Sequence, residues 1–119
     1  MAKVDSFRWG SIVIDGKKYH HDVIIFPDGS VRRRKGLFLS LFAHSIEKRE
    51  IAELVKAGAE VAVAGKGTSG KAHLSAEAED YAKGANLKLL ALSSPEAVKK
   101  LNQLVEQGEK VGAILHITC

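Results

Sequence analysis

The hydrophobic period of the chain changes near residue 45, and this change constrains the fold more than any other feature of the sequence. Beyond that point lie the wholly apolar run VAVA at 61–64 and the largely apolar runs LKLLAL at 87–92 and VGAILHI at 111–117. They alternate with segments whose apolar residues recur every three or four positions, which is typical of amphipathic helices, whereas a wholly apolar short run is typical of a buried strand. The order strand–helix–strand–helix–strand predicts an α/β unit with right-handed crossovers.

Three helices are expected in this part of the chain. The first covers residues 46–57, with Ser45 as its N-cap and Glu47 in the first turn, where the helix dipole favours negative charge. The second spans roughly 75–84, from its apolar spacing. The third begins at Ser94-Pro95-Glu96, with serine as the cap and proline at the first helical position.

The first third of the chain is expected to form antiparallel β-structure. FRWGSIVI and KKYHHDVIIF flank Asp15-Gly16, a dipeptide that suits a two-residue hairpin because both turn residues take positive φ. Pro27-Asp28-Gly29 predicts the next turn, and SVRRR the strand after it. These hairpins would extend or cover the α/β sheet.

Length and composition indicate one ordinary globular domain, residues 1–119. Hydrophobic residues make up 45% and charged residues 27%, and the net charge is only +4, so a polyanion partner is permitted but not implied. The one cysteine is the last residue, which favours a reducing compartment; no apolar run suits secretion or membrane insertion, and we expect a cytoplasmic protein. GLFLSLFAHS, at 36–45, is open between a helical turn and an apolar flap that contacts a partner.

The loop after VAVA fits two phosphate-binding patterns and completes neither. Gly65-x-Gly67-x-x-Gly70 matches the dinucleotide fingerprint, but the helix begins late and the next strand ends without a carboxylate. The P-loop pattern fails at Ala72, which cannot supply the hydroxyl that binds Mg²⁺. We therefore favour a tight strand exit over nucleotide binding. A weaker ligand site at this edge of the sheet stays open, since ligands of open α/β folds bind there.

The end of the chain, His116-Ile-Thr118-Cys119, has three interpretations. His116 could deprotonate Cys119 and make a nucleophile beside the amides of the glycine loop. Alternatively, His116 is a half-buried structural histidine, and Thr118 and Cys119 anchor the terminus. In a third interpretation, the carboxylate of Cys119 docks against the glycine-loop amides or the helix cap at Ser94. We favour a structural role over catalysis.

Asp22 and the basic run 32–35 form the other candidate site. Two hairpins of the expected register place Asp22 opposite Trp9 on one side and Arg34 on the other. A structural ion pair of Asp22 with Arg34 or another arginine of the run is therefore favoured over an acid catalyst. Strand parity puts Arg32 and Arg34 on one face and Arg33 on the other. His20 and Asp22 share a face, but two ligands do not make a zinc site, and no metal is expected.

The ending GAILHITC, together with IDGKKYHHDVIIFPDGSVRRRK, VAVAGKGTSG and SPEAVKKLNQLVEQGEKVGAILHITC, closely resembles the small Mth-type domain family. That family includes uncharacterised archaeal and bacterial proteins, a vertebrate adipogenesis-associated protein and a mitochondrial complex I assembly factor. The resemblance implies a three-layer α/β domain around a mixed sheet, with one strand antiparallel to the others. It implies no enzymatic activity and no cofactor, and it suggests assembly or regulatory roles.

The resemblance also carries over to particular residues. It covers Asp22, the run Arg33-Arg34-Lys35, Gly65 and Gly67, and the final His116, Thr118 and Cys119. Relatives read Gly-Thr-Ser-His before the first helix, where this chain has Leu41-Phe42-Ala43-His44, so only His44 matches.

We expect a small binding or assembly-type domain without enzymatic activity, which contacts a protein partner through the sheet-edge cleft and the apolar segment 37–42. The alternatives are a small-molecule enzyme using the Gly65–Gly70 loop with His116 and Cys119, and a weak nucleic-acid binder. A small anion is a possible ligand; nucleic acid is not the expected partner, because an aromatic stacking platform is missing. The candidate ligand-binding residues are Asp22, Arg33, Arg34, His44, Gly65, Lys66, Gly67, Thr68, Ser69, Gly70, His116, Thr118 and Cys119.

Overall fold

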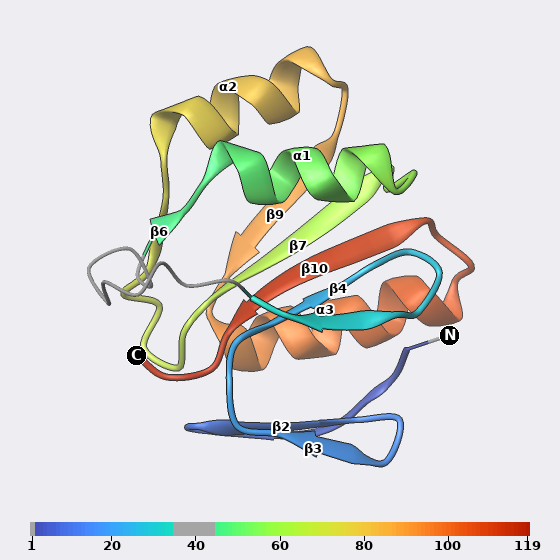
Figure 1. Ribbon diagram of the computed structural model, residues 1–119, viewed down its shortest axis with the longest axis vertical. Helices are drawn as coiled ribbons and strands as arrows, with labels where there is room; N and C mark the ends of the chain where they lie inside the picture. Colours follow the sequence, from blue (N-terminus) through green and yellow to red (C-terminus); the bar gives the residue numbers. More distant parts are fainter. Residues whose placement is uncertain (1, 35–44) are drawn as a thin grey trace.

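In the computed structural model, which describes residues 2–34 and 45–119, a five-stranded mixed sheet separates two apolar cores (Figure 1). Helices α1 and α2 cover one face of the sheet, and α3 with a second, three-stranded sheet covers the other. The elements before α1 are β1 (Val4–Arg8), β2 (Ser11–Ile14), β3 (Lys17–Tyr19), β4 (Val23–Ile25), β5 (Val31–Arg33) and β6 (Ser45–Ile46). They are followed by α1 (Lys48–Lys56), β7 (Val61–Lys66), β8 (His73–Leu74), α2 (Ala76–Gly84), β9 (Lys88–Leu92), α3 (Ser94–Glu106) and β10 (Val111–His116).

The central sheet has the strand order β5-β4-β10-β7-β9. Strands β7, β9 and β10 are parallel, as the strand–helix alternation predicts, and β4 runs antiparallel to both β10 and β5. Because β5 is reversed again, β4 is the one strand opposed to the other four. The parallel unit expected from the periodicity and the mixed sheet implied by the resemblance are therefore both confirmed.

The N-terminal region differs from the expected hairpins in two places. The segment expected as one strand at 7–14 forms two strands, β1 and β2, separated by a turn at Trp9 and Gly10, where Gly10 has a φ of 84°. KKYHHDVIIF is likewise divided: β3 pairs with β2, whereas β4 lies in the central sheet. The β2–β3 ladder ends at Ile12 and Tyr19, so the expected pairing of Asp22 with Trp9 is wrong. The chain must bend between β3 and β4 because the two strands belong to different layers.

Both predicted hairpin turns are confirmed. Asp15 and Gly16 connect β2 to β3 with φ angles of 49° and 83°. The turn at 27–29 connects β4 to β5, and Gly29 has a φ of 90°.

The helix starts are displaced from two of the predicted caps. The N-cap of α1 is Glu47 rather than Ser45, which lies in β6, and the amide of Glu47 is held by the carboxylate of Glu50 at 3.0 Å. The N-cap of α3 is Ser93 rather than Ser94, although the proline lies at the helix start as predicted. For α2 the prediction is confirmed, with Ser75 accepting a hydrogen bond from the Ala78 amide.

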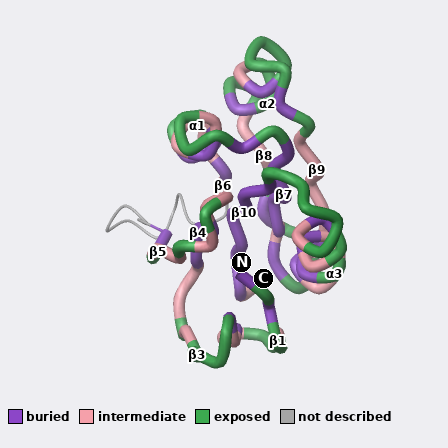
Figure 2. Tube along the Cα trace, turned by 90° about the vertical axis from the view of Figure 1, so that its right-hand side faces the viewer, coloured by how far each residue is buried: buried purple, intermediate pink, exposed green. Residues whose placement is uncertain are grey.

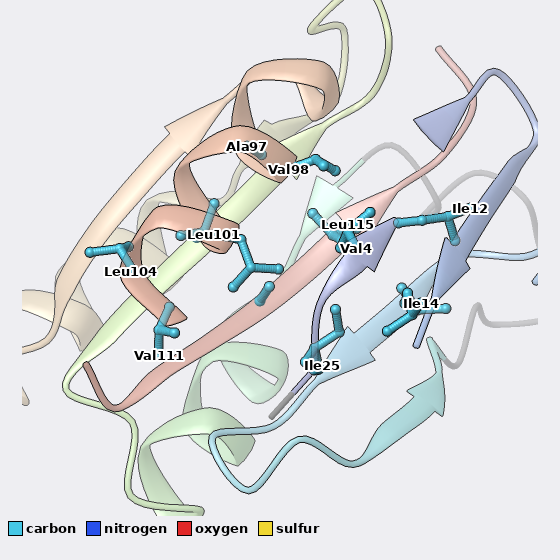
Figure 3. Packing of buried hydrophobic residues seen from close by; sticks show 14 of the residues in the cluster. Val4, Ile12, Ile14, Ile25, Ala97, Val98, Leu101, Leu104, Val111 and Leu115 are labelled. Carbon is cyan, nitrogen blue, oxygen red and sulfur yellow. The ribbon is translucent and has the colours of Figure 1, made fainter. Parts of the chain in front are cut away.

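Alternating residues of the central strands divide the two cores. In β7, Val61 and Val63 face α3, whereas Ala62 and Ala64 face α1 and α2. Figure 2 shows that β7 and β10 are buried along nearly their whole length. In the core on the α3 side, residues of α3 and β10 pack with Val4, Ile12 and Ile14 of the three-stranded sheet (Figure 3). The side chain of Asn102 adds polar contacts, because it bonds both the amide and the carbonyl of Val4.

The segment 36–45 lies outside the described residues except for Ser45, so the expectation of a helical turn or an apolar flap there, including the partner contact at 37–42, stays a prediction. Within the described residues, no helix is long and apolar enough to cross a bilayer.

Candidate functional site

The predicted site residues gather at one end of the central sheet, which we call the rim. It comprises residues 8–10, 20–22, 33–34, 66–72, 93–94 and 116–119. Parallel strands end at the same edge of a sheet, so β7, β9 and β10 bring three of these segments together. The amide of Gly10 donates to the carbonyl of Ile117 at 2.7 Å, which attaches the β1–β2 turn to the same end.

Asp22 is the centre of the polar contacts at the rim. Its Oδ2 accepts a hydrogen bond from His116 Nδ1 at 2.8 Å and from Arg34 Nη1 at 3.1 Å, and its Oδ1 accepts from the Ile117 amide at 2.9 Å. Asp22 lies in the bend between β3 and β4, next to the end of β10. At this place its carboxylate accepts from three donors, which are His116, Arg34 and the Ile117 amide. The favoured Asp22–Arg34 ion pair is thus present, and His116 is a partner that the sequence did not indicate.

Arg34 joins Asp22 to the start of α1. The residue is 6% exposed, and its guanidinium binds Glu50 through two atoms, Nε to Oε2 at 2.5 Å and Nη2 to Oε1 at 3.0 Å. The guanidinium also donates to the carbonyl of Ser45. Arg32, two residues earlier, pairs with Glu53 of the same helix. Both arginines therefore face α1, as strand parity predicts. Asp22, Arg34, Glu50 and His116 are called the Asp22 network below.

The network changes the pKa of two of its members. Burial raises the pKa of Asp22, but the hydrogen bonds from His116 and Ile117 and the charges of His116 and Arg34 outweigh it and hold this pKa below the ordinary 3.8. Burial lowers the pKa of Arg34, but the hydrogen bonds and charges of Glu50 and Asp22 outweigh burial and raise this pKa above its ordinary value. Because the folded-state pKa of Asp22 is depressed, its ionised carboxylate contributes to stability above about pH 4. This contribution is lost as the pH falls through the depressed folded-state pKa.

The glycine loop is closed against the end of the same chain. The amide of Thr68 donates to the carbonyl of Thr118 at 2.7 Å, and the amide of Lys71 donates to the oxygen of Cys119 at 3.2 Å. Gly67 has a φ of 95°, and a Cβ at this position would lie 2.1 Å from the carbonyl carbon of Cys119. Backbone donors that a phosphate would need are thus bonded to residues 118 and 119. This arrangement agrees with the favoured strand exit and with the docking of Cys119 against the loop.

Ser94 is a rim residue whose role the sequence misplaced. Its hydroxyl accepts from the Gly67 amide at 2.8 Å and donates to the carbonyl of His116 at 2.5 Å, and the residue is fully buried. It therefore links the ends of β7 and β10 instead of capping α3. A serine directly before Pro95 has the usual signature of a cap, and only the position of β7 and β10 reveals the other role.

Replacement of Ser94 by alanine is expected to lower the free energy of unfolding by about 1–3 kcal/mol, because the Gly67 amide and the His116 carbonyl lose a buried partner. Ser93→Ala is the matched control, since Ser93 makes no side-chain cap bond and its loss is expected to cost less than about 0.5 kcal/mol. Urea unfolding of the two variants measures the difference; equal losses would show that the bonds of Ser94 to Gly67 and His116 do not stabilise the fold.

The remaining predicted residues differ in how close they come to the network. The Nδ1 atom of His116 contacts Asp22, and its Nε2 atom contacts the hydroxyl of Thr118 at 3.2 Å, whereas Cys119 is exposed. Arg33 is exposed and points away from Arg34. Gly65 packs closely on Ser94 and Leu115. The other loop candidates are the half-buried Lys66 and Gly70 and the exposed Thr68 and Ser69, and His44 lies outside the described residues.

The described rim residues do not form a metal centre. Among the residues that the structure describes, no group of three histidine, cysteine, aspartate or glutamate side chains could hold a metal ion. A pocket of about 330 Å³ lies between α2 and β9, and its lining shares no residue with the Asp22 network.

Comparison with known proteins gives a consistent result over nearly the whole chain. A family model described as "Protein of unknown function (DUF498/DUF598)" matches residues 4–116. Among solved structures, the chain is similar to MT938, with 25% identity over 100% of both chains and a TM-score of 0.84. It is also similar to a conserved hypothetical protein from Pyrococcus horikoshii OT3, with 27% identity over 98% of this chain and 99% of that chain and a TM-score of 0.86. A Mth938-like domain from Bordetella pertussis has 15% identity over 98% of this chain and 85% of that chain, with a TM-score of 0.68, which shows a shared fold.

Proposed function

We propose, from the premise that this chain belongs to the DUF498/DUF598 family of Mth938-like proteins, that it is a small binding domain of the assembly type, which recognises an acidic segment of a partner protein at the rim. The resemblance to Mth-type domains that the sequence suggested is confirmed by the family match. The binding role and the acidic partner are our proposal.

The observation that carries the proposal is the set of exposed aromatic and basic side chains at the rim. Trp9 is 63% exposed, and it is the one exposed large hydrophobic side chain among the described residues. Arg8, Arg33 and Lys71 are exposed at the same end, and Lys66 is partly exposed. Tryptophan and arginine are enriched among the residues that dominate the energy of protein interfaces, and basic side chains steer acidic partners.

The Asp22 network offsets only part of this positive charge. Asp22 is the acidic residue at the centre of the rim, and it shares the positive charge of Arg34 with Glu50. With a neutral His116, the network therefore sets one negative charge against the four cations of the rim. Buried paired charges hold β4, β5, β10 and α1 in one arrangement, so the cations around them are displayed on a rigid support. This supports a preorganised binding surface, because less conformational freedom is lost on association.

Binding can be measured through Trp9, since it is the only tryptophan of the chain and its fluorescence reports directly on the rim. We expect a decaglutamate peptide to change the Trp9 emission in a saturable manner at low salt, with a weaker effect as salt screens the charges. The triple variant Arg33→Glu, Lys66→Glu, Lys71→Glu is expected to weaken binding by at least about tenfold, because each rim charge steers and holds the acidic peptide.

The matched control is the triple variant Lys56→Glu, Lys83→Glu, Lys110→Glu. The three substitutions make the same change in net charge, but these exposed residues lie outside the rim. Equal weakening by both triple variants would contradict a site at the rim, and would indicate a response to net charge alone. Preference for a single-stranded oligonucleotide over the acidic peptide would favour the nucleic-acid alternative instead.

A further inference from the structure

Three side chains at the rim form a hydrogen-bonded series whose chemistry the binding role does not use. Asp22 Oδ2 contacts His116 Nδ1 at 2.8 Å, and His116 Nε2 contacts Thr118 Oγ1 at 3.2 Å. A carboxylate, an imidazole and a hydroxyl joined in this order are the arrangement that activates a hydroxyl for attack on an acyl group.

The charge of Asp22 decides which nitrogen of His116 carries the proton. A carboxylate whose pKa is held low accepts hydrogen bonds and has no proton to donate, so His116 Nδ1 must be the donor. In the neutral ring, Nε2 is then the acceptor and faces the Thr118 hydroxyl. Asp22 is itself held in place by Arg34 and by the Ile117 amide, which fixes the ring in this tautomer.

Within the series, the general base His116 is more deeply buried than the hydroxyl of Thr118. His116 is 2% exposed, whereas Thr118 is partly exposed and the following Cys119 is exposed. The base is thus shielded from bulk water, while the hydroxyl lies at the surface of the rim.

We propose that Thr118 is an acyl-acceptor site, whose hydroxyl is activated by His116 and Asp22 and takes an acyl group from small activated esters. Thr118 Oγ forms a bond to the carbonyl carbon as its proton passes to His116 Nε2. The bond from that carbon to the leaving oxygen then breaks, and the proton returns from Nε2 to the leaving group, giving an acyl-threonine and an alcohol. The acyl transfer needs none of the exposed cations that would bind the acidic partner, so either proposal can fail without the other.

The test uses p-nitrophenyl acetate and the full chain carrying Cys119→Ala, which removes the competing thiol. Trypsin cleavage after Lys110 releases residues 111–119. In this peptide, the side chains that could have been acetylated in the intact protein are the Thr118 hydroxyl and the His116 ring. We expect a stable single acetyl group on this peptide by mass spectrometry. Thr118→Val should abolish it, and Thr118→Ser should retain it.

His116→Asn tests the activation itself. Asparagine can still donate to Asp22 but offers no base to Thr118, so acetylation should slow by about 10²-fold, the usual range for general-base assistance. Ser6→Ala, an exposed hydroxyl on β1, is the control and should label peptide 111–119 at the parent rate. Absence of the acetyl group in the parent or in Thr118→Ser would overturn the proposal, as would an unchanged rate in His116→Asn. Circular dichroism of each variant confirms that the fold is intact.

Discussion

Replacing Arg34 with methionine is expected to lower the free energy of unfolding by about 3–5 kcal/mol at pH 7, a large share of the 5–15 kcal/mol typical of a domain. The substitution leaves the carboxylates of Asp22 and Glu50 buried without their shared guanidinium. Both accept bonds from Arg34 now, and Glu50 also holds the amide at the start of α1. Urea unfolding at pH 7 measures the loss under conditions where Asp22 is ionised in the folded state.

Arg32→Met is the matched control for this variant, because it removes the same kind of side chain two residues earlier on the same face. Arg32 and Glu53 are 39% and 36% exposed, so this pair is expected to contribute only about 0–1 kcal/mol. Arg34→Lys should fall between the two, since an ammonium keeps the charge but cannot make the two-atom contact with Glu50. A loss for Arg34→Met no greater than that for Arg32→Met would show that the network does not stabilise the fold.

Gly67→Ala is expected to cost about 2–4 kcal/mol and to release residues 118 and 119 from the glycine loop. The φ of 95° strains any residue with a Cβ, and the added carbon would lie 2.1 Å from the carbonyl carbon of Cys119. Because backbone atoms cannot yield as a flexible side chain does, the bonds from Thr68 and Lys71 to the tail should break. Hydrogen exchange at the amides of Thr68 and Lys71 measures the release, and thermal unfolding measures the cost.

Gly70→Ala separates the clash from the backbone strain. Gly70 lies in the same loop with a φ of 68°, but a Cβ there would meet nothing within 4 Å. We expect a loss of about 1 kcal/mol and unchanged exchange at Thr68 and Lys71. If both glycine variants exchange alike, the tail is not held by contact with Gly67.

Local sequence signals predicted most of the central architecture. The apolar runs at 61–64, 87–92 and 111–117 correspond to β7, β9 and β10. The explanation holds best for β7 and β10, which are buried on both faces and so require apolar residues at every position, whereas β9 is an edge strand with an exposed Lys88. The turns at 15–16 and 27–29 were also predicted, since their glycines adopt a backbone conformation that other residues avoid.

The sequence was less informative where a residue serves a distant partner. Ser94 has the local pattern of a helix cap, yet its hydroxyl links Gly67 to His116. The division of KKYHHDVIIF between two sheets has no turn signal, because the bend is required by the layers on either side. For the candidate site, the pairing of Asp22 with Arg34 followed from hairpin register, whereas its bond to His116, 94 residues away, did not.

The sequence by itself determined the parallel β-α-β-α-β unit, the two glycine-dependent turns and the presence of a carboxylate that needs a cation, because periodicity, allowed φ angles and the cost of burying charge act within a few residues. Only the tertiary structure decided that His116 bonds Asp22 on one side and Thr118 on the other. It also decided that the backbone carbonyl of Cys119 packs against Gly67, in the space that a Cβ would occupy. Those contacts depend on how β4, β7 and β10 are ordered in the sheet, and strand order is set by the packing of the whole domain.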